Sequence, residues 1–471
     1  MEKERSFAAL RMTSPIAKLS IVGLGASLAP LDIAVNVALP AITDHFALVL
    51  GDVQWLVVCY VLVYGSLMLV CGKMGDLFGH RLIFRIGLVV SAVGCGACAI
   101  APDWPLFLLA RTMQGVGTAL ALACTPALAT AVYPPEQRIN ALAGYAMAMS
   151  IAATAGPFLG GVLVSTWGWQ AVYWVRVPIA LLALALSGAL PSPPTQSRQF
   201  DLLGAILLAA SMSTLLLVLV ISQRPAGSWS MALGLLAAAL ALLHRYVMRS
   251  LNAPEPIIRP ELFTDAAFTI PNVMNALANL AGFAVLLLTP YYLMNVLHLS
   301  AVVSGLMLAL AYTGALAGAP LAARLVPWFG RGPTAFVGVA IVGLGLLPLG
   351  FTGEATAVSL VAFLLVLEGV GQGLLNVAYT DLVTGTLPER DRGVAGSLAL
   401  LTRTVGIVSG ASILTALHAH GAAGGDFLAG YRFAFVSAGG GLLVALALSC
   451  LWWRAWFGRK EAEPGMAGTP S

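Results

Sequence analysis

The stretch from Leu28 to Pro40, LAPLDIAVNVALP, places a single acidic residue, Asp32, in an otherwise apolar run. Asn36 follows four residues later, so a helix would carry both side chains on one face. A low dielectric favours the neutral form of a carboxyl group and an adjacent arginine favours the ionised form, so a carboxyl group in such surroundings can load and release a proton. We therefore expect Asp32 to carry or control a proton. The alternative is that it caps or pairs with a neighbouring helix.

Arg111 is the natural cation in the same half of the chain, and Gln114 lies three residues further on. A fixed structural ion pair is one role for such an arginine, and the resemblance described below implies another.

A polar stripe also runs through the apolar segment EGVGQGLLNVAYTD, where Glu368, Gln372 and Asn376 follow one another at intervals of four. Glu368 is a candidate second proton or cation site, with Arg403 as its possible partner, and structural pairing is the alternative.

Asn275 and Asn279, four residues apart, and Tyr291 further along provide polar and aromatic groups for a substrate. The residues expected to line a substrate cavity are Asn36, Gln114, Asn275, Asn279, Gln372, Asn376, Tyr291 and Arg403. Hydrogen bonding between helices is the alternative for the two asparagines.

The composition indicates whether these residues lie in a water-soluble protein or in a lipid bilayer. The chain is 59% hydrophobic and 9% charged, against about 25% charged in soluble domains. Its apolar residues form runs of about 20, long enough to cross a bilayer as helices. We expect an all-α polytopic membrane protein with 14 transmembrane helices, centred near Leu28, Leu62, Val93, Leu120, Ile151, Ala180, Leu208, Ala238, Ala281, Ala311, Val342, Gly371, Val408 and Val444.

Basic residues gather in the short loops after even-numbered spans, as expected if both termini are cytoplasmic. The net charge of +4 therefore reflects topology in a cytoplasmic membrane and does not indicate nucleic-acid binding. Cys95 and Cys98 have C-x-x-C spacing, but no second pair and no histidine lies nearby, so packing on a helix explains them better. His418 and His420 could contact a metal, but a solvated external loop explains them better, and no nucleophile lies beside a base. We expect no metal, no cofactor and no enzymatic activity.

Two weak internal matches have nearly the same offset. KMGDLFGHR resembles RLVPWFGRG, aligning Phe78 with Phe329, 251 residues later, and PPEQRINALAG resembles PERDRGVAGSL, aligning Arg138 with Arg392, 254 residues later. The sequence thus predicts two six-helix bundles, residues 1–190 and 266–456, with a linker and two inserted helices at 191–265 and a disordered tail at 457–471.

Three motifs resemble those of the major facilitator superfamily. GKMGDLFGHR (Gly72–Arg81) is similar to its loop signature, RTMQGVGTA (Arg111–Ala119) to its R-x-x-Q-G pattern, and GPFLGG (Gly156–Gly161) to its antiporter signature. LDIAVNVALP is similar to the first-span motif of the fourteen-helix drug:proton antiporter branch, although Gln170 and Arg176 stand where that branch usually has Arg and Asn. The resemblance implies that Arg111 assists proton movement and that the chain exports drugs.

The first motif has the chemistry of a cytoplasmic latch. Its glycines permit a sharp turn, and its acid and base can pair with each other or with helix ends; a static surface ion pair is the alternative. The expected latch residues are Gly72, Gly75, Asp76, Gly79, Arg81 and Arg138.

The antiporter motif allows another helix to approach closely. Gly156 and Gly160 lie on one helical face, Pro157 removes a backbone hydrogen bond, and Gly161 follows. A bend at a rocking interface and plain close packing are equally compatible with this pattern.

These features predict a proton-coupled exporter of amphipathic drugs or related small organic compounds that works by alternating access. A specific metabolite exporter with the same fold is the nearest alternative, and a non-transporting membrane receptor is another. The expected partners are a small-molecule substrate, protons and the lipid bilayer, and the protein is expected to be a monomer.

Overall fold

The computed structural model describes residues 14–133, 138–192, 202–221, 229–252, 260–386, 392–422 and 425–457. Within these ranges every regular element is helical. The side chain of Arg138, most of the expected linker segment 191–200 and the tail after residue 457 lie outside the description.

The first half of the chain forms a bundle of helices around a broken first span. In chain order its elements are α2 (Pro15–Ala26), η1 (Pro30–Ile33), α3 (Ala34–His45), α4 (Leu50–Phe78), α5 (His80–Ile100), α6 (Trp104–Ala131), α7 (Arg138–Trp167), α8 (Ala171–Trp174), α9 (Arg176–Leu186) and η3 (Ser187–Ala189).

Two helices, α10 (Leu202–Ile221) and α11 (Trp229–Asn252), precede the second bundle. The remaining elements are η4 (Pro260–Thr264), α12 (Ala266–Tyr291), η5 (Tyr292–Val296), α13 (Ala301–Phe329), α14 (Arg331–Leu349), α15 (Val358–Thr386), α16 (Arg392–Gly421), α17 (Phe427–Ser449), η7 (Cys450–Trp452) and α18 (Trp453–Phe457).

Side-chain caps mark where several of these helices begin. Ser14 accepts a hydrogen bond from the amide of Ala17 at the start of α2, and Asp103 accepts one of 2.9 Å from the amide of Leu106 at the start of α6. Such caps satisfy backbone amides that have no partner within the helix. They appear in the sequence as Ser-Pro and Asp-Trp-Pro at the ends of apolar runs.

Twelve helices in the described residues are long and apolar enough to cross a membrane, which makes the chain a multi-pass membrane protein. The expected number of 14 is not confirmed. The two other expected positions, near Leu208 and Val408, are occupied by α10 and α16, which do not meet the same criteria of length and hydropathy over described residues.

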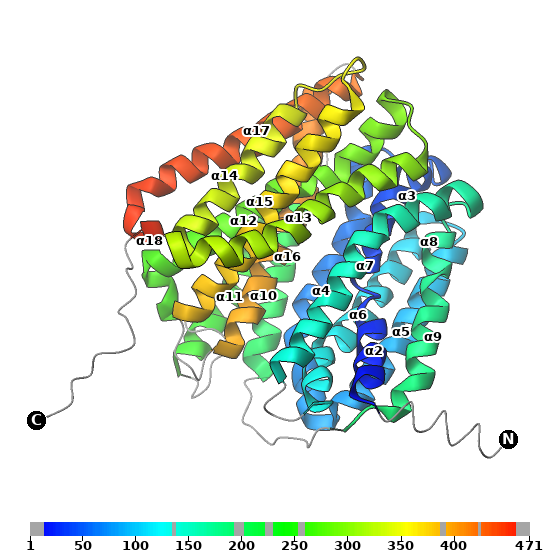
Figure 1. The fold of residues 1–471 in the computed structure, drawn as a ribbon, viewed down its shortest axis with the longest axis vertical. Helices are drawn as coiled ribbons and strands as arrows, with labels where there is room; N and C mark the ends of the chain where they lie inside the picture. Colours follow the sequence, from blue (N-terminus) through cyan, green and yellow to red (C-terminus); the bar gives the residue numbers. More distant parts are fainter. Residues whose placement is uncertain are drawn as a thin grey trace, which may run out of the picture.

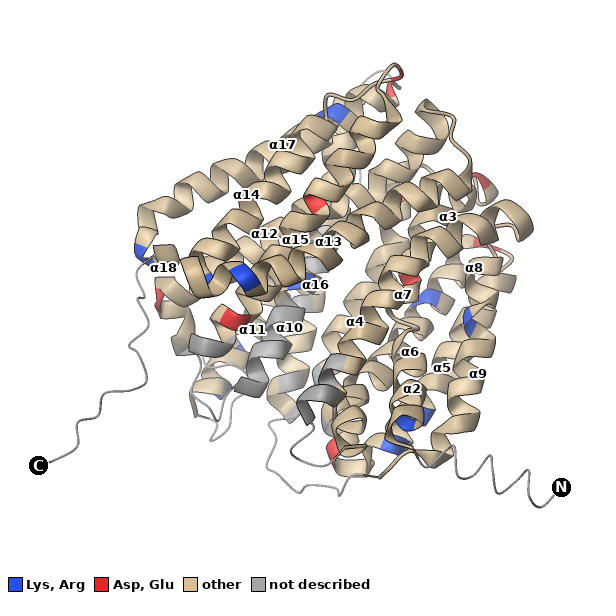
Figure 2. Cartoon of the chain, in the orientation of Figure 1, with Lys and Arg blue, Asp and Glu red and all other residues tan. Residues whose placement is uncertain are grey.

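Figure 1 shows the helices from α2 to α9 grouped on one side and those from α12 to α17 on the other. Figure 2 shows that most of the ribbon is uncharged, with acidic and basic residues mainly near helix ends and a few in the interior. The few interior charges define the candidate sites described below.

A helix boundary repeats at the first of the offsets seen in the sequence. Helix α13 begins at Ala301, 251 residues after the start of α4. Gly79 after α4 and Gly330 after α13 both have positive φ, 97° and 92°. Only glycine adopts this backbone conformation without strain, so both halves make the same turn with the same residue type.

The first span breaks in the segment that contains Asp32. Helix α2 ends at Ala26, and the chain passes through the short 3-10 helix η1 before continuing as α3. Pro30 opens η1 and has no amide hydrogen to donate, which prevents a continuous helix. Asp32 therefore lies in the break between two helical pieces rather than on a regular helix.

Candidate functional site

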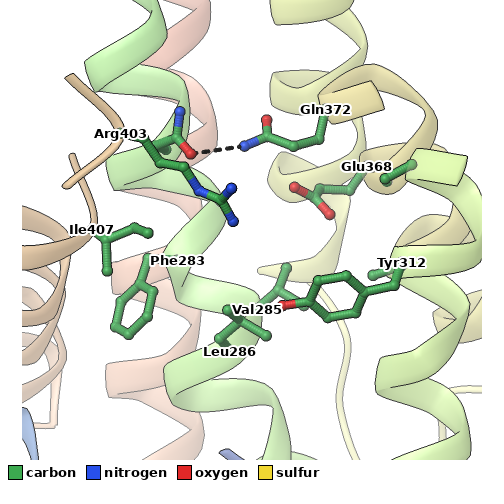
Figure 3. A pocket seen from close by; sticks show the side chains of 13 residues that line it. Phe283, Val285, Leu286, Tyr312, Glu368, Gln372, Arg403 and Ile407 are labelled. Atoms are coloured by element: carbon green, nitrogen blue, oxygen red, sulfur yellow. Dashed lines mark hydrogen bonds between the residues drawn. The ribbon is translucent and has the colours of Figure 1, made fainter. Parts of the chain in front are cut away.

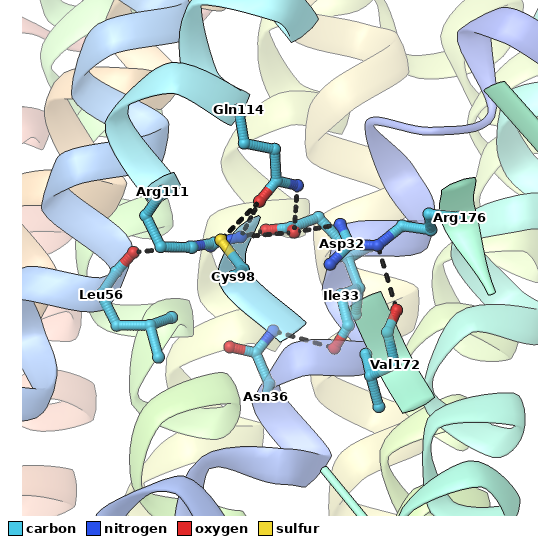
Figure 4. Close-up of polar contacts among 9 residues, drawn as sticks. All are labelled: Asp32, Ile33, Asn36, Leu56, Cys98, Arg111, Gln114, Val172 and Arg176. Carbon is cyan, nitrogen blue, oxygen red and sulfur yellow. Dashed lines mark hydrogen bonds and ion pairs between the residues drawn. The ribbon is translucent and has the colours of Figure 1, made fainter. Parts of the chain in front are cut away.

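Asp32 forms the centre of a buried charge cluster in the first bundle (Figure 4). Its Oδ1 and Oδ2 accept hydrogen bonds of 2.8 and 3.0 Å from the two terminal nitrogens of Arg111 on α6. Gln114 donates to Oδ1 over 3.1 Å, and Arg176 at the start of α9 forms an ion pair with the same oxygen. The cluster thus ties the broken segment to two other helices.

The backbone of neighbouring helices holds both guanidinium groups in place. Nε of Arg111 donates to the carbonyl oxygen of Leu56 on α4 over 3.3 Å, and Nε of Arg176 donates to Val172 over 3.2 Å. The Arg111 guanidinium also lies 4.5 Å from the ring centroid of Tyr60. Each arginine is only 1% exposed, so neither can leave its position without a change in packing.

The charges of this cluster do not cancel. One carboxylate faces two guanidinium groups, and Nη2 of Arg176 is buried with no hydrogen-bond partner in the described part of the chain. A proton on Asp32 would leave two buried cations without a counter-charge, which is costly in a low dielectric. Loss of the charge on Asp32 would therefore weaken the contacts that hold both arginines.

Arg176 was absent from the predicted site residues, although it is a central member of the cluster. One feature of the sequence could have identified it. Arg176 lies inside an apolar span, and a charged residue at such a position is rare and usually functional. Asn36, which was predicted to line a substrate cavity, donates to the carbonyl oxygen of Ile33 over 3.1 Å and is not part of the lining of the cavity described next.

A second site is a cavity of about 90 Å³ in the second bundle (Figure 3). Helices α12, α13, α15 and α16 all contribute to its walls. The lining residues are Asn279, Gly282, Phe283, Val285, Leu286, Ala311, Tyr312, Ala315, Glu368, Gly369, Gln372, Arg403 and Ile407. Of the residues predicted for this half, the cavity brings together Asn279, Glu368, Gln372 and Arg403.

Glu368 is 5% exposed and lies in the wall formed by α15. No hydrogen bond or ion pair joins it to any residue in the described part of the chain. Gly282 on α12 makes room for it, because a methyl group at that glycine would lie 3.1 Å from Oε1 of Glu368. A buried acid without a partner is expensive to keep, and such residues are usually functional.

An amide network beside Glu368 links three helices. Gln372 donates to Asn279 over 3.2 Å, Asn279 donates to the carbonyl oxygen of Asn275 over 2.8 Å, and Asn275 donates to Thr402 on α16 over 2.9 Å. Both asparagines thus bond within and between helices, as the alternative interpretation of the sequence held. Oε1 of Gln372 is buried without a partner among the described residues.

Arg403 lines the same cavity as Glu368 but is not its ion-pair partner among the described contacts, which corrects the expected pairing. The two side chains project from α16 and α15 on different sides of the cavity, with the Arg403 guanidinium facing the space between them (Figure 3). Arg403 is exposed, whereas Glu368 is buried.

The other residues predicted for a substrate cavity lie elsewhere. Asn376 is exposed and is not part of the cavity lining. Tyr291, also outside it, shares a hydrogen bond of 2.6 Å with Thr43 on α3, so it joins the two bundles. Gln114 belongs to the Asp32 cluster.

Asp76 and Arg81 of the predicted latch each pair with another group in the described contacts, and not with each other. Asp76 pairs with His80 over 3.2 Å, while Arg81 donates to the carbonyl oxygen of Leu190 over 3.1 Å, at the end of the helical segment after α9. Pairing of the arginine with a helix end is the second of the two arrangements expected from the sequence. Gly72 and Gly75 lie in the last turns of α4, and the Arg138 side chain lies outside the described residues.

The antiporter motif lies where α7 meets both α3 and the second bundle. A methyl group at Gly160 would lie 2.7 Å from the carbonyl oxygen of Ala34, two residues after Asp32. Gly161 faces the backbone of Ala301, and Gly305 faces the carbonyl oxygen of Pro157. Gly156 faces the backbone at Pro30 on the same side as Gly160. The small residues allow α7 to approach η1, α3 and α13 at backbone contact distance.

Comparison with known proteins identifies the family of this chain. The sequence model of the Major Facilitator Superfamily matches residues 21–411 and 272–468. The tetracenomycin C resistance and export protein of Streptomyces glaucescens is 30% identical over 412 residues, or 86% of this chain and 76% of that protein. The methylenomycin A resistance protein of Bacillus subtilis is 28% identical over 469 residues, 98% and 100% of the two chains.

The fold also matches a solved transporter structure. A bacterial homologue of the human lysosomal transporter Spinster, in an inward-facing and unoccupied conformation, superimposes with a TM-score of 0.70 at 16% identity, covering 95% of this chain and 99% of that chain. At this level of identity the likeness shows a shared fold.

Proposed function

The chain belongs to the Major Facilitator Superfamily, and on this premise we propose that it exports amphipathic drugs or related small organic compounds in exchange for protons. The two relatives described above are named for antibiotic resistance or export, which supports the direction of transport and the class of cargo. As in other transporters of this family, the substrate is moved between two sides of the membrane without chemical change.

The observation that carries the proposal is the position of Glu368. It is a buried acid that lines the cavity of the second bundle and has no partner in the described part of the chain. An ionised carboxylate in this position attracts either a proton or a donor group of a substrate. Because both compete for the same oxygens, the protein releases one when it binds the other, as exchange requires.

In the proposed cycle, substrate from the cytoplasm binds while Glu368 is ionised. The bundles then rock, the cavity opens to the outside, and an external proton displaces the substrate. The return step carries the proton inward and releases it, which restores the ionised acid. A proton gradient directed inward therefore drives export.

We assign Asp32 and its two arginines a coupling role in the first bundle. The carboxylate fastens η1 to α6 and α9, and its loss of charge would loosen both attachments at once. Because η1 is continuous with α3, which contacts the second bundle at Thr43, a change at Asp32 can be transmitted to the interface.

We propose that the end of the molecule that contains Thr43 and Tyr291 is external. Basic residues such as Arg81 and Arg85 lie near the opposite end, which the positive-inside rule assigns to the cytoplasm. In this orientation the contacts of α7 with the start of α13 close the external side, and the turn at Gly79 is a cytoplasmic latch.

The finer architecture belongs to the same proposal. We propose 14 transmembrane helices, with bundles at 1–190 and 266–456 and α10 and α11 inserted between them, in a monomer that lies in the cytoplasmic membrane with both termini inside. Helix α10 contacts α4 and α16, and Ser66 and Ser213 share a hydrogen bond of 2.9 Å, which supports a place for the inserted pair beside both bundles.

The test is transport in proteoliposomes under an imposed proton gradient, with the fluorescent cation ethidium as first probe and a panel of amphipathic compounds after it. We expect the gradient to drive flux through the native protein, and Glu368→Gln to abolish the dependence on the gradient. Arg432→Gln, at an exposed position of α17, is the control. Gradient-driven flux that survives in Glu368→Gln would contradict the assignment of the proton to this residue, and no flux of any compound would contradict drug export.

A further inference from the structure

The cavity of the second bundle has two walls of opposite character (Figure 3). On the α15 side lie the carboxyl group of Glu368 and Gln372, whose Oε1 has no hydrogen-bond partner among the described residues. On the α16 side lies the guanidinium group of Arg403. One wall therefore accepts hydrogen bonds and positive charge, and the other donates hydrogen bonds and attracts negative charge.

The two charged groups also differ in depth. Glu368 is 5% exposed and Arg403 is an exposed residue, so the acid lies at the deep end and the guanidinium lies toward the opening. The described contacts include no ion pair between them. Each charge is thus available to a ligand in this conformation.

This arrangement discriminates among ligands by charge. A simple monocation is drawn to Glu368 but passes the guanidinium of Arg403 on the way, and a simple monoanion is drawn to Arg403 but is repelled by Glu368. A molecule with a positive or N–H donor end and a separate anionic or carbonyl end satisfies both walls. A monocation beside Arg403, or a monoanion beside Glu368, loses binding energy through repulsion of like charges. A molecule with both kinds of end avoids this loss.

We propose that this cavity binds amphoteric substrates, with an amino group directed at Glu368 and a carboxylate or comparable oxygen group at Arg403. The inference rests on the proposed export function and names the substrate class of the same site. The amino end competes with the proton for Glu368, and the oxygen end adds selectivity without taking part in that competition.

The size of the cavity limits what enters it. Its volume of about 90 Å³ is well below the roughly 300 to 1,000 Å³ of pockets that enclose drug-sized ligands. We therefore expect the amino end to enter and the oxygen group to lie at the opening beside Arg403, while the apolar body of the substrate remains outside the cavity. Phe283 and Ile407 give the cavity apolar surface for the part of the substrate beside the amino group.

A matched pair of dyes tests the proposal. Rhodamine 110 is a zwitterion at neutral pH, and rhodamine 123 is its methyl ester and a monocation with the same rings and amino groups. Binding is measured by fluorescence anisotropy with the full chain in lipid nanodiscs at neutral pH. We expect rhodamine 110 to bind about tenfold more tightly, the equivalent of one moderate charge contact.

Variants of Arg403 identify the source of the preference. Arg403→Gln should bring the ratio of the two affinities to about one, Arg403→Lys should retain most of it, and Arg432→Gln should leave it unchanged. Because the readout is a ratio, partial loss of folded protein affects both dyes equally. Equal affinities, tighter binding of the ester, no binding of either dye, or an unchanged ratio in Arg403→Gln would overturn the proposal.

The outcome is separable from that of the export proposal. Gradient-driven flux of rhodamine 123 with weaker binding of rhodamine 110 would leave proton-coupled export intact and remove the amphoteric class. Preferential binding of rhodamine 110 with no gradient-driven flux of any compound would support the site and remove the export function.

Discussion

The carboxylate of Asp32 and the guanidinium of Arg111 face each other in a bidentate pair, with hydrogen bonds of 2.8 and 3.0 Å across the interior of the first bundle. Arg176 approaches the same carboxylate from α9, so one negative charge joins three elements that are distant in the sequence. The stability of the protein should therefore respond differently to the loss of the one negative charge and to the loss of one of the two positive charges.

Asp32→Asn should destabilise the protein strongly, because it leaves two buried guanidinium groups without a counter-charge. Removing one partner of a buried ion pair costs about 3 to 5 kcal/mol. We expect a lower midpoint of thermal unfolding in detergent. Adding Arg176→Asn to this variant should recover part of the loss, because it removes one of the two uncompensated cations.

Arg176→Asn by itself is the matched control for that double variant. It leaves the bidentate pair of Asp32 and Arg111 intact, so its effect on the unfolding midpoint should be much smaller than that of Asp32→Asn. If the single and double variants of Asp32 unfold at the same temperature, the surplus charge of Arg176 has no energetic consequence and our account of the cluster is wrong.

Substrate affinity should depend on pH through Glu368. A substrate amine binds the ionised acid and a proton competes with it, so affinity falls as the pH is lowered through the titration range of this residue. For a single competing proton the limiting change is about tenfold per pH unit. Anisotropy titrations of rhodamine 110 across pH measure this slope.

Glu368→Gln should remove the pH dependence together with much of the affinity, since the amide neither ionises nor offers a charge to an amine. Asn376→Asp places a new carboxyl group two turns along the same helix, outside the cavity, and should leave the slope unchanged. A pH dependence that persists in Glu368→Gln would assign the competing proton to another group.

Tyr291→Phe should favour the conformation that is open on the external side. It removes the hydrogen bond of 2.6 Å to Thr43 that joins α12 to α3 across the two bundles. A hydrogen bond of this kind contributes about 0.5 to 1.5 kcal/mol, which shifts a two-state equilibrium about two- to tenfold. Spin-label distances between the bundles at the end that contains Thr43 and Tyr291, which we propose is external, report the shift.

Tyr292→Phe is a close control for the neighbouring residue. Its hydroxyl group donates to the carbonyl oxygen of Gly353 within the second bundle, over 3.0 Å, so its loss should change stability but not the distance between bundles. The same distance distribution for both variants would show that the Tyr291 hydroxyl does not hold the external side closed.

Gly305→Ala should impair transport by keeping α7 and α13 apart. A methyl group at this position meets the carbonyl oxygen of Pro157, and backbone atoms cannot yield as a flexible side chain can. We expect loss of gradient-driven flux in proteoliposomes with folded protein retained, as judged by size-exclusion chromatography.

Gly441→Ala is the comparison, because nothing lies within 4 Å of the methyl group that it adds on α17. Alanine is also about 0.5 to 1 kcal/mol more favourable than glycine within a helix, so this variant should be at least as stable as the native protein. Equal flux in the two variants would mean that the contact at Gly305 is not required for the transport cycle.

Much of the fold could be predicted from local patterns. Long apolar runs are visible in the sequence because each transmembrane helix satisfies its own backbone hydrogen bonds and faces lipid, so its length and composition follow from local requirements. The matched motifs also predicted a repeat of the two halves, and the turns at Gly79 and Gly330, 251 residues apart, are each made by a glycine with positive φ.

The sequence also predicted which charged residues lie in the interior of the protein. Asp32, Arg111 and Glu368 stood out because charged residues within apolar spans are costly and are seldom retained without a role. The sequence determined, by itself, that such residues exist and that the two acids lie in different halves of the chain.

Only the tertiary structure decided which of these groups meet. Arg176 and Asp32 are 144 residues apart in the chain, and their contact depends on how α9 packs beside the break in the first span. Glu368 and Arg403 lie on α15 and α16, where a pattern along the chain suggested an ion pair, yet the cavity between the helices separates them. The physical reason is that each helix specifies its own axis and apolar face locally, whereas its rotation and the distance to its neighbours are set by close packing of residues from distant parts of the sequence.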